Sequence, residues 1–209
     1  NKMGFIEKDL RNAMYKVQRN VLRVGDACGT LAYLDGRAKS DPNFFYKYAV
    51  DKKNRLKRIF LSNAQSRLNY QYFGDILAFD STYCTNTYKK PLVLLVGVNH
   101  HFVTIIFGYA VIANETKDMY KWVLESFLEA MNMKIPISVA TDGDSAMKNA
   151  MNMTIPFAHH QLCSWHLKRN VGINKNKDFL CDFTIAMEMT CSVEEFEKRW
   201  QLIIEKHNL

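Results

Sequence analysis

Hydrophobic positions along the chain change between helical and strand spacing. Between Leu10 and Val21 apolar residues recur every three or four positions, which predicts an early helix, and residues 27–38 are expected to form a second one. Two runs rich in Phe, Tyr and Val then flank the polar stretch "DKKN", a pattern typical of a β-hairpin. Residues 1–72 are therefore predicted to be a helical and β-hairpin region.

The middle of the chain, residues 73–172, combines strands with helices. Three strands are predicted over residues 76–83, 91–99 and 102–112, and their short connections indicate an antiparallel meander. A helix over residues 117–133 follows. After it come the strand "ISVAT", a helix begun by "DGDSAMKNAM", the strand candidate "FAHHQLC" and the helix "SWHLKRNV". This β-β-β-α-β-α-β-α order predicts an α/β, ribonuclease-H-like core, in which flanking helices cover a mixed five-stranded sheet.

The last part of the chain, residues 173–209, returns to helical spacing from Asp178 onward. It is predicted to be the start of a helical insertion. Its expected packing residues are Phe196, Trp200, Leu202 and Ile203.

Composition narrows the class of protein. At 209 residues and 48% apolar, the chain can bury the core of one domain with an attached helical piece. No charged-then-apolar leader is present, and Asn99, His100 and His101 interrupt the richest apolar region, so neither a signal peptide nor a membrane span is expected. Five cysteines at irregular spacing fit reduced thiols better than a disulfide framework. The sequence is expected to be a piece of a larger intracellular protein.

Positive charge is concentrated in the first third of the chain. Residues 1–70 carry 15 basic and 6 acidic side chains, whereas the remainder carries 13 and 15. A basic surface attracts phosphate groups, but it also keeps many proteins soluble. One basic cluster is a candidate DNA-binding or nuclear-import patch, with a solvated hairpin tip as the alternative. It consists of Lys52, Lys53, Arg55, Lys57 and Arg58.

Asp80 is a carboxylate inside the first predicted strand of the meander. In a ribonuclease-H-like sheet this strand is central, so the carboxylate would lose hydration unless a cation or hydrogen bonds compensate. The strand that ends at Asp142 would lie beside it, with both acids at the same end of the sheet. A divalent metal relieves the repulsion between two carboxylates and supplies a Lewis acid for phosphoryl transfer. Asp80 and Asp142 are therefore candidate ligands of Mg²⁺.

Each aspartate also has a purely structural interpretation. Asp80 is followed by Ser81 and Thr82, and these residues could end the strand in a polar turn. The stretch from Asp142 to Asp144 resembles a turn that leads into a helix, and Asp144 is expected to be its N-cap. Neither aspartate alone decides between the two interpretations.

Five stretches resemble the central region of the plant FAR-RED IMPAIRED RESPONSE family, transcription regulators descended from Mutator-like transposases. They are "DPNFFYKYAVDKKNRL", "SRLNYQYFGDILAFDSTYCTNTYKKPLVLLVGVNHH", "WVLESFLEAM", "ISVATDGDSAM" and "HHQLCSWHLKRN". The resemblance covers essentially the whole chain, and the combination is highly specific. One departure is "LSNAQSR", where the family usually has a "WADA.SR"-like segment. This departure is expected to change a surface or lid contact rather than the core.

The resemblance implies a transposase core with an Asp-Asp-Glu site. Its first two acids correspond to Asp80 and Asp142, and a Cys-x2-His motif after the fifth strand corresponds to Cys163 and His166. In this family the third acid follows a helical insertion, so it is expected beyond Leu209. The late glutamates are interpreted as a solvated helix face rather than as the catalytic acid. They are Glu194, Glu195, Glu197 and Glu205.

Cys163 and His166 have three possible roles. A thiolate and an imidazole at this spacing can share a zinc ion, but two ligands are half of a site, and recruiting Cys181 or Cys191 would require the chain to fold back. Alternatively, the pair lies near the acidic residues, with His166 donating to a phosphate or a carboxylate. The third possibility is a packed cysteine and a hydrogen-bonded histidine.

Two functions follow from the resemblance. In the first, the transposase core survives in a nuclear transcription regulator as a scaffold for dimerisation, activation or partner binding, without catalysis. In the second, it is an active transposase that cuts and joins DNA with two Mg²⁺ or Mn²⁺ ions. The first is favoured, because the resemblance is strongest to the domesticated plant proteins.

The resemblance also implies partners and a location. The implied partners are DNA, which the full-length protein would contact, other transcription regulators, and family members in homo- or heterodimers. No membrane partner is expected, and the implied location is the nucleus. Zinc is expected only in an N-terminal module that this chain does not contain.

Overall fold

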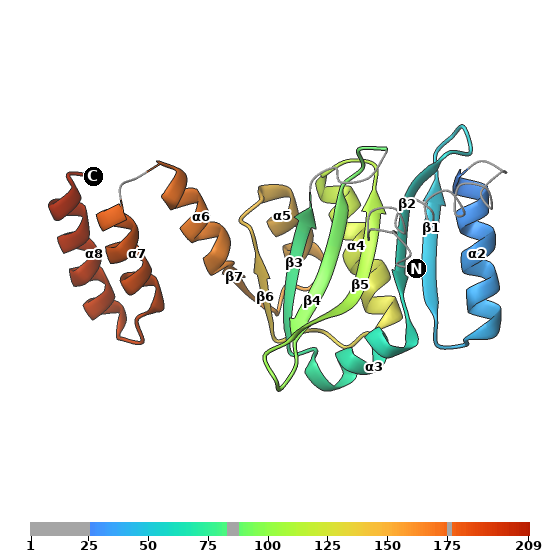
Figure 1. The fold of residues 1–209 in the computed structure, drawn as a ribbon, viewed down its shortest axis with the longest axis horizontal. Helices are drawn as coiled ribbons and strands as arrows, with labels where there is room; N and C mark the ends of the chain where they lie inside the picture. Colours follow the sequence, from blue (N-terminus) through green and yellow to red (C-terminus); the bar gives the residue numbers. More distant parts are fainter. Residues whose placement is uncertain (1–25, 83–87, 175–176) are drawn as a thin grey trace, which may run out of the picture.

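The computed structural model describes residues 26–82, 88–174 and 177–209. The predicted helix between Leu10 and Val21 lies outside these residues. The described strands are β1 (Phe45–Val50), β2 (Leu56–Ser62), β3 (Ile76–Thr82), β4 (Leu92–Val98), β5 (Thr104–Ile112), β6 (Ser138–Thr141) and β7 (His159–Leu162). They form one mixed sheet in the order β1-β2-β5-β4-β3-β6-β7 (Figure 1).

The predicted fold class is confirmed, with a larger sheet than expected. The meander β3-β4-β5 is antiparallel, and β6 and β7 join β3 as parallel strands, which is the arrangement expected for the ribonuclease-H-like core. The sheet has seven strands instead of five because the hairpin β1–β2 pairs with the outer side of β5. Arg58 lies opposite Ile112, and Leu61 lies opposite Tyr109. Apolar spacing predicts each strand, but it does not show which strands pair.

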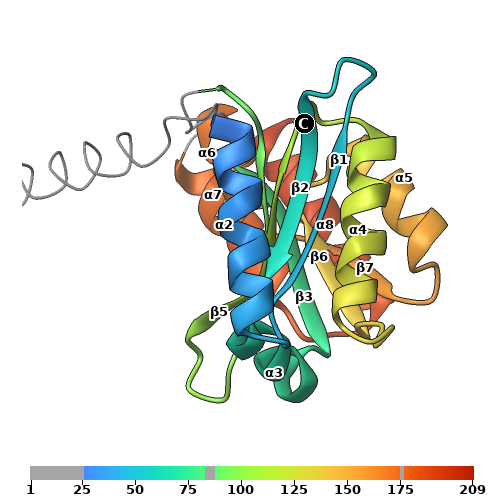
Figure 2. The ribbon, with the colours of Figure 1, turned by 90° about the vertical axis from the view of Figure 1, so that its right-hand side faces the viewer.

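Helices cover the two faces of the sheet unequally. Helices α4 (Lys117–Ala130) and α5 (Ser145–Thr154) lie on one face, and α2 (Asp26–Ser40) packs against β1 on the other (Figures 1 and 2). Every third or fourth residue of α4 is apolar, so one side of this helix is buried against the strands. The main hydrophobic core therefore lies between the sheet and the α4–α5 layer.

Aromatic rings fill the centre of this core. Tyr70 and Phe127 meet edge to face with their ring centroids 4.9 Å apart, and Tyr70 meets Phe107 in the same way at 5.0 Å. Phe60 and Phe79 are fully buried beside them. Edge-to-face pairs add about 0.5–1.5 kcal/mol beyond the burial of their area. These contacts fix α4 against the sheet.

Helix α3 (Ala64–Phe73) was not predicted from the sequence. Its N-cap is Asn63, whose side-chain Oδ1 accepts a hydrogen bond from the Ser66 amide at 2.7 Å. Asn63 belongs to "LSNAQSR", the stretch that departs from the family pattern. Asparagine and aspartate are equally good N-caps, so the asparagine preserves the start of this helix.

The C-terminal helices form a second layer with its own small core. They are α6 (Ser164–Asn174), α7 (Lys177–Glu188) and α8 (Val193–His207). Phe179, Ala186 and Ile203 are buried there, and Trp200 packs against them. The prediction that Leu202 packs inward is wrong, because its side chain is 64% exposed. The next residue, Ile203, lies about 100° further around the helix and is buried against α7 instead.

Candidate functional site at the carboxyl ends of the central strands

Strand pairing places Asp80 and Asp142 at the same end of the sheet. Strands β3 and β6 are parallel neighbours, and Ala78 lies opposite Ala140. Asp80 and Asp142 each lie two residues further along the chain. We call this the acidic end of the sheet. Parallel strands keep equivalent residues in register, so the two distant acids are brought to one place.

Asp80 points away from the main core. The preceding residue, Phe79, is fully buried and its ring meets Tyr120 of α4 edge to face. Successive residues of a strand point to opposite faces, so Asp80 faces the side of the sheet opposite α4. Its side chain is 41% exposed. Partial exposure lets water share in solvating this carboxylate.

Asp142 begins the turn that leads from β6 into α5. Its Oδ1 accepts a hydrogen bond from the Asp144 amide at 3.0 Å, and Gly143 between them has a φ of 96°, a conformation that glycine adopts without steric cost. Asp144 Oδ1 accepts from the Met147 amide at 2.8 Å. The prediction that Asp144 is the N-cap of this helix is confirmed.

His166 reaches the acidic end from the first turn of α6. Its Nε2 lies 3.9 Å from Asp80 Oδ1, and its side chain is 21% exposed. Its Nδ1 is buried and has no hydrogen-bond partner among the residues that the structure describes. At this separation a protonated His166 forms an ion pair with Asp80, whereas a neutral imidazole is too far away for a hydrogen bond. Of the four predicted site residues, Asp80 and His166 are thus the two that the structure places within ion-pair distance of each other.

Cys163 lies between β7 and α6 as a half-buried free thiol. Its amide donates to the Thr141 carbonyl at 2.6 Å, which extends the β6–β7 pairing by one residue. Across residues 26–82, 88–174 and 177–209, no three His, Cys, Asp or Glu side chains are grouped so that they could hold a metal ion. A shared zinc ion therefore stays only one of the three alternatives for Cys163 and His166.

The donor atoms at the acidic end suit a hard divalent cation. Mg²⁺ usually binds through one or two carboxylates together with substrate phosphates and water. Asp80 and Asp142 are two carboxylates in register on neighbouring strands, so their oxygens are the ones that would hold Mg²⁺ or Mn²⁺. Such an ion would supply a Lewis acid.

Glu115 is a residue of this end that the sequence did not indicate. It lies between β5 and α4, where its Oε1 accepts hydrogen bonds from Ser81 Oγ at 2.5 Å and from the Tyr120 hydroxyl at 3.2 Å. Burial raises the pKa of Tyr120, and the nearby carboxylates of Glu115 and Asp144 raise it further, so the hydroxyl stays protonated and donates. Glu115 therefore fixes the end of β3 from the core side. No spacing in the sequence relates these residues, because they come from three elements.

The β1–β2 turn lies at the same end of the sheet as the acids (Figure 1). Within its basic cluster, Arg55 is paired with Asp51: the two side chains meet at 2.7 Å. Hydrogen bonds from the Arg55 backbone and side chain lower the pKa of Asp51 to about 2. This pair closes the turn.

The other members of the basic cluster point in different directions. The Arg58 guanidinium lies over the Trp122 ring of α4, 4.6 Å from its centroid, and burial lowers its pKa. Lys52, Lys53 and Lys57 are exposed. The structure thus leaves four of the five predicted basic side chains open to solvent at this end, and of these Arg55 is held by Asp51.

Comparisons with known proteins agree with this core. The profile of the MULE transposase domain matches residues 76–170, which run from β3 into α6. Over the whole of this chain, the sequence is 33% identical to Protein FAR1-RELATED SEQUENCE 5 of Arabidopsis thaliana. Over 99% of this chain, it is 28% identical to Protein FAR-RED IMPAIRED RESPONSE 1 of the same plant. The family predicted from the sequence is confirmed. The chain spans only 27% and 26% of these two FAR-RED IMPAIRED RESPONSE relatives.

Among solved structures, the catalytic core of BIV integrase is 12% identical, with a TM-score of 0.30. The match covers 62% of this chain and 81% of the integrase core. This likeness is too weak to support an inference by itself. Separately, none of the helices in the described ranges is both long and apolar enough to cross a membrane.

Proposed function

We propose that this chain is the transposase-derived central domain of a plant nuclear transcription regulator of the FAR-RED IMPAIRED RESPONSE family. In this proposal it serves as a scaffold for dimerisation, activation or partner binding in promoter-linked regulation and does not cut DNA. The similarity along essentially all of this chain to the central part of relatives such as Protein FAR-RED IMPAIRED RESPONSE 1 supports this proposal, together with the MULE transposase domain match.

The observation that carries the proposal is the contact between His166 and Asp80. A carboxylate that binds catalytic metal must be available to the cation. Here the His166 imidazole occupies one side of that carboxylate, with its Nε2 3.9 Å from Asp80 Oδ1. Asp80 can therefore be retained for the structure of the domain.

The alternative is a working transposase core that cleaves and joins DNA with Mg²⁺ or Mn²⁺. The register of Asp80 and Asp142 favours it, because two carboxylates at one end of neighbouring strands are what such a site requires. In that case the two aspartates would hold the metal and His166 would face the substrate phosphate.

An incision assay separates these functions. The full-length protein, which includes the region beyond Leu209 where the third acid is expected, is incubated with labelled DNA carrying a transposon end, in the presence of Mg²⁺ or Mn²⁺, beside its double variant Asp80→Asn/Asp142→Asn. We expect the same background for both proteins. Specific strand cleavage by the parent that is lost in the variant would overturn the scaffold proposal.

A reporter assay tests the regulatory part. The full-length protein with Asp80→Asn/Asp142→Asn should activate its promoter as strongly as the parent, and both proteins should localise to the nucleus as fluorescent fusions. Phe127→Ala, which disrupts the core, should lose activation. A loss of activation in the aspartate variant, with normal protein levels, would contradict a purely structural role for these acids.

Nonspecific DNA contacts are proposed for three exposed lysines, Lys52 and Lys53 in the β1–β2 turn and Lys57 at the start of β2. The variant Lys52→Gln/Lys53→Gln/Lys57→Gln should bind duplex DNA more weakly and with a shallower salt dependence, because each lost phosphate contact lowers the slope by about 0.9. The matched control is Lys39→Gln, which removes a lysine already paired with Asp35. An unchanged salt slope in the triple variant would exclude this role.

A further inference from the structure

Strand β1 carries a row of aromatic side chains at one edge of the sheet. The row consists of Phe44, directly before the strand, and of Tyr46 and Tyr48 within it. Alternate residues of a strand point to the same face. Lys47, between the two tyrosines, points to the other face and pairs with Glu129 of α4 at 2.6 Å. We call Phe44, Tyr46 and Tyr48 the aromatic row.

The rings of the aromatic row are evenly spaced. The ring centroids of Phe44 and Tyr46 lie 6.4 Å apart, and those of Tyr46 and Tyr48 are also separated by 6.4 Å. The planes of the two tyrosine rings are within 6° of parallel. Successive bases along one strand of a duplex are only about 3.4 Å apart. The row therefore matches bases that are spread apart along a single strand, rather than bases stacked on one another.

The aromatic row opens to solvent toward the β1–β2 turn. At its start the Arg37 guanidinium of α2 lies over the Phe44 ring, 5.8 Å from the centroid. At its other end the Tyr48 side chain is 45% exposed, and Val50, two residues further along β1, is 44% exposed. A ligand would therefore reach the row from the side of the turn.

The surface along the row is positively charged. Residues 35–57 contain seven Lys or Arg side chains and only three acidic ones, all of them aspartates. Asp35 pairs with Lys39 at 2.6 Å. Asp51 pairs with Arg55 at 2.7 Å. Because two of the three acids are neutralised in this way, the remaining basic side chains set the sign of the charge that a ligand would meet.

Three lysines continue this positive surface from the open end of the row. Lys52 and Lys53 are exposed in the β1–β2 turn. Arg58 faces Trp122 of α4, so Lys57, the residue before it, points to the same side of the sheet as the aromatic row. In the described part of the chain these lysines form no ion pair. Their ammonium groups are available to phosphate oxygens.

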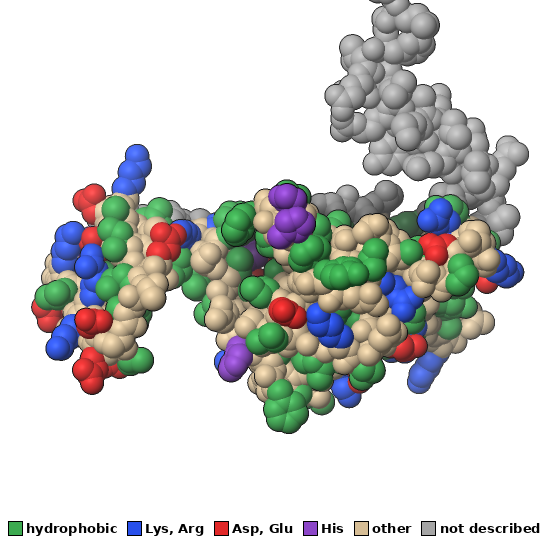
Figure 3. Space-filling view, turned by 90° about the horizontal axis from the view of Figure 1, so that it is seen from below, with side chains coloured by type: hydrophobic (Ala, Val, Ile, Leu, Met, Phe, Trp, Pro, Cys, Tyr) green, Lys and Arg blue, Asp and Glu red, His purple; other side chains and the backbone are tan. Residues whose placement is uncertain are grey.

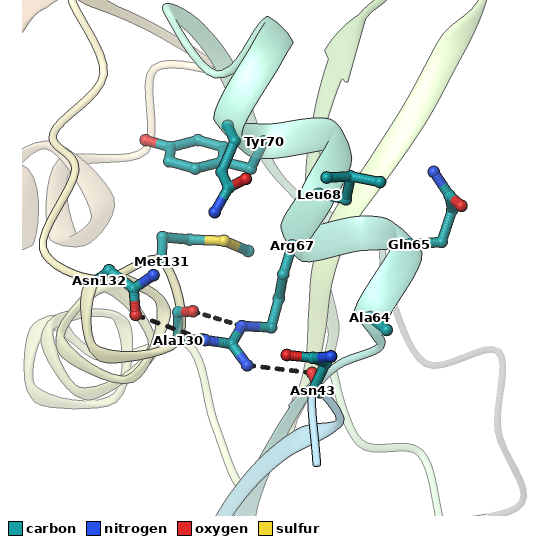
Figure 4. Close-up of a pocket in the computed structure, with 10 residues that line it drawn as sticks. Asn43, Ala64, Gln65, Arg67, Leu68, Tyr70, Ala130, Met131 and Asn132 are labelled. Atoms are coloured by element: carbon teal, nitrogen blue, oxygen red, sulfur yellow. Dashed lines mark hydrogen bonds between the residues drawn. The ribbon is translucent and has the colours of Figure 1, made fainter. Parts of the chain in front are cut away.

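The opposite end of the strands is built differently. A hollow of about 340 Å³ lies there between α3 and the end of α4 (Figure 4). The guanidinium that lines it belongs to Arg67, whose Nε donates to the Ala130 carbonyl at 2.7 Å and a terminal nitrogen to the Asn43 carbonyl at 3.0 Å. Figure 3 looks onto this end and shows hydrophobic groups spread between separate Lys and Arg groups. Evenly spaced rings beside unpaired lysines are a feature of the β1 edge.

We propose that the aromatic row and the three lysines form a binding site for single-stranded nucleic acid. Unpaired bases stack on the rings of Tyr46 and Tyr48, and the lysines contact the phosphates that connect them. The bases of a duplex are stacked on one another, so the rings cannot reach their faces. This site goes beyond the proposed scaffold function, and it uses neither Asp80 nor Asp142.

Fluorescence anisotropy with labelled oligonucleotides of about 12 nucleotides tests the site. The variant Tyr46→Val/Tyr48→Val removes both rings from the 209-residue chain and keeps residues that favour strands. It should raise the Kd for oligo(dT) about tenfold or more, with an unchanged salt dependence. Its Kd for a duplex of the same length should equal that of the parent. Oligo(U), measured alongside, should respond to the variant in the same way, and a tighter Kd than for oligo(dT) would assign a contact to the 2′-hydroxyl.

The lysines are tested through the salt dependence. In Lys52→Gln/Lys53→Gln/Lys57→Gln the slope for oligo(dT) should become shallower by about 0.7 for each phosphate contact that is lost. The tyrosine variant lacks rings and the lysine variant lacks charges. A site that uses both therefore shows two separable effects, one on the Kd at every salt concentration and one on the slope.

Matched controls separate stacking from folding. Tyr46→Phe/Tyr48→Phe keeps both rings and should bind oligo(dT) as tightly as the parent. Tyr72→Leu removes a tyrosine of α3 that is 71% exposed at the opposite end of the strands, and it should also leave the Kd unchanged. Thermal melting should give the same midpoint for all these variants. If the double valine variant melts earlier, Tyr48→Val alone, at the more exposed position, should still show part of the loss.

Three results would overturn the inference. The parent could fail to bind oligo(dT) at low salt, the double valine variant could bind it as tightly as the parent, or the double phenylalanine variant could lose as much affinity as the valine variant. None of them affects the scaffold proposal, whose failure would appear as metal-dependent DNA cleavage in the separate incision assay.

Discussion

The sheet with its covering helices and the C-terminal layer α6–α8 are stabilised on very different scales. Among the described residues, the main core unites 23 buried apolar side chains from α3, α4, α5 and the strands, whereas the C-terminal layer buries three. The two are linked at the acidic end, where Cys163 pairs with Thr141 and His166 approaches Asp80. Because buried apolar area is the main source of stability, the sheet should hold its fold while the C-terminal layer opens locally.

The largest effect is expected from Phe127→Ala in the main core. Phe127 is 1% exposed and contacts Tyr70 and Phe60 edge to face, so its removal leaves a cavity that neighbouring rings cannot fill. The free energy of unfolding should fall by about 3–5 kcal/mol. Urea denaturation measures it, and a loss below about 1 kcal/mol would mean that the core is loosely packed.

Trp200→Ala tests the C-terminal layer in the same way. Trp200 stacks on Phe196 and meets Phe183 edge to face, but it is only partly buried, so a smaller loss of about 2 kcal/mol is expected. Hydrogen exchange should show α7 and α8 losing protection while β3, β4 and β5 keep theirs. Equal loss in both regions would show that they unfold as one unit.

Two helix caps offer a matched pair, one in each region. Asn63 caps α3, and Ser192 caps α8 in a capping box with Glu195. Asn63→Ala and Ser192→Ala should each cost about 1 kcal/mol of local stability. By contrast, Asn63→Asp should cost nothing, since aspartate caps equally well. If Ser192→Ala lowers the global unfolding midpoint as much as Asn63→Ala does, the two regions are coupled more tightly than their cores indicate.

Acidification should weaken the two regions in different pH ranges. His160 of β7 shares a hydrogen bond with Thr141 of β6, and burial, together with the positive charge of Lys148, lowers the pKa of His160. The contribution of His160 to the stability of the sheet is therefore complete above about pH 6.5 and falls below that pH. Hydrogen bonds from Lys206 and His207 lower the pKa of Asp182 between α7 and α8, so that contribution is lost only below about pH 4. Stability measured against pH for His160→Gln and Asp182→Asn should lack the corresponding step.

Most strands and helices follow from local spacing. The strand at Thr104–Ile112 and the helix starting at Lys117 agree with prediction because their apolar periodicity extends over several turns or pleats. Helix α3 was missed, since Ser66, Arg67, Asn69 and Gln71 give it a largely polar sequence and the helix is stabilised by the Asn63 cap and by Tyr70 in the core. The break between α7 and α8 was missed too, although Ser192 and Glu195 have the spacing of a capping box.

The candidate site was predictable only in part. The resemblance to the family indicated Asp80, Asp142, Cys163 and His166, and strand order then placed the two aspartates at one end of the sheet. The contact between His166 and Asp80 depends on where α6 turns after β7, and Glu115 depends on three elements meeting. Such positions are set by packing between distant segments.

The sequence by itself determined the order of the elements, the family and the identity of the acids, because each is encoded in local spacing or in short stretches of residues. Tertiary structure alone decided that the hairpin enlarges the sheet, that Arg55 pairs with Asp51 while it stays exposed, and that Arg58 lies over the Trp122 ring. The physical reason is that partner choice depends on which surfaces meet once the main core has formed, and residues far apart in the chain contribute to each contact.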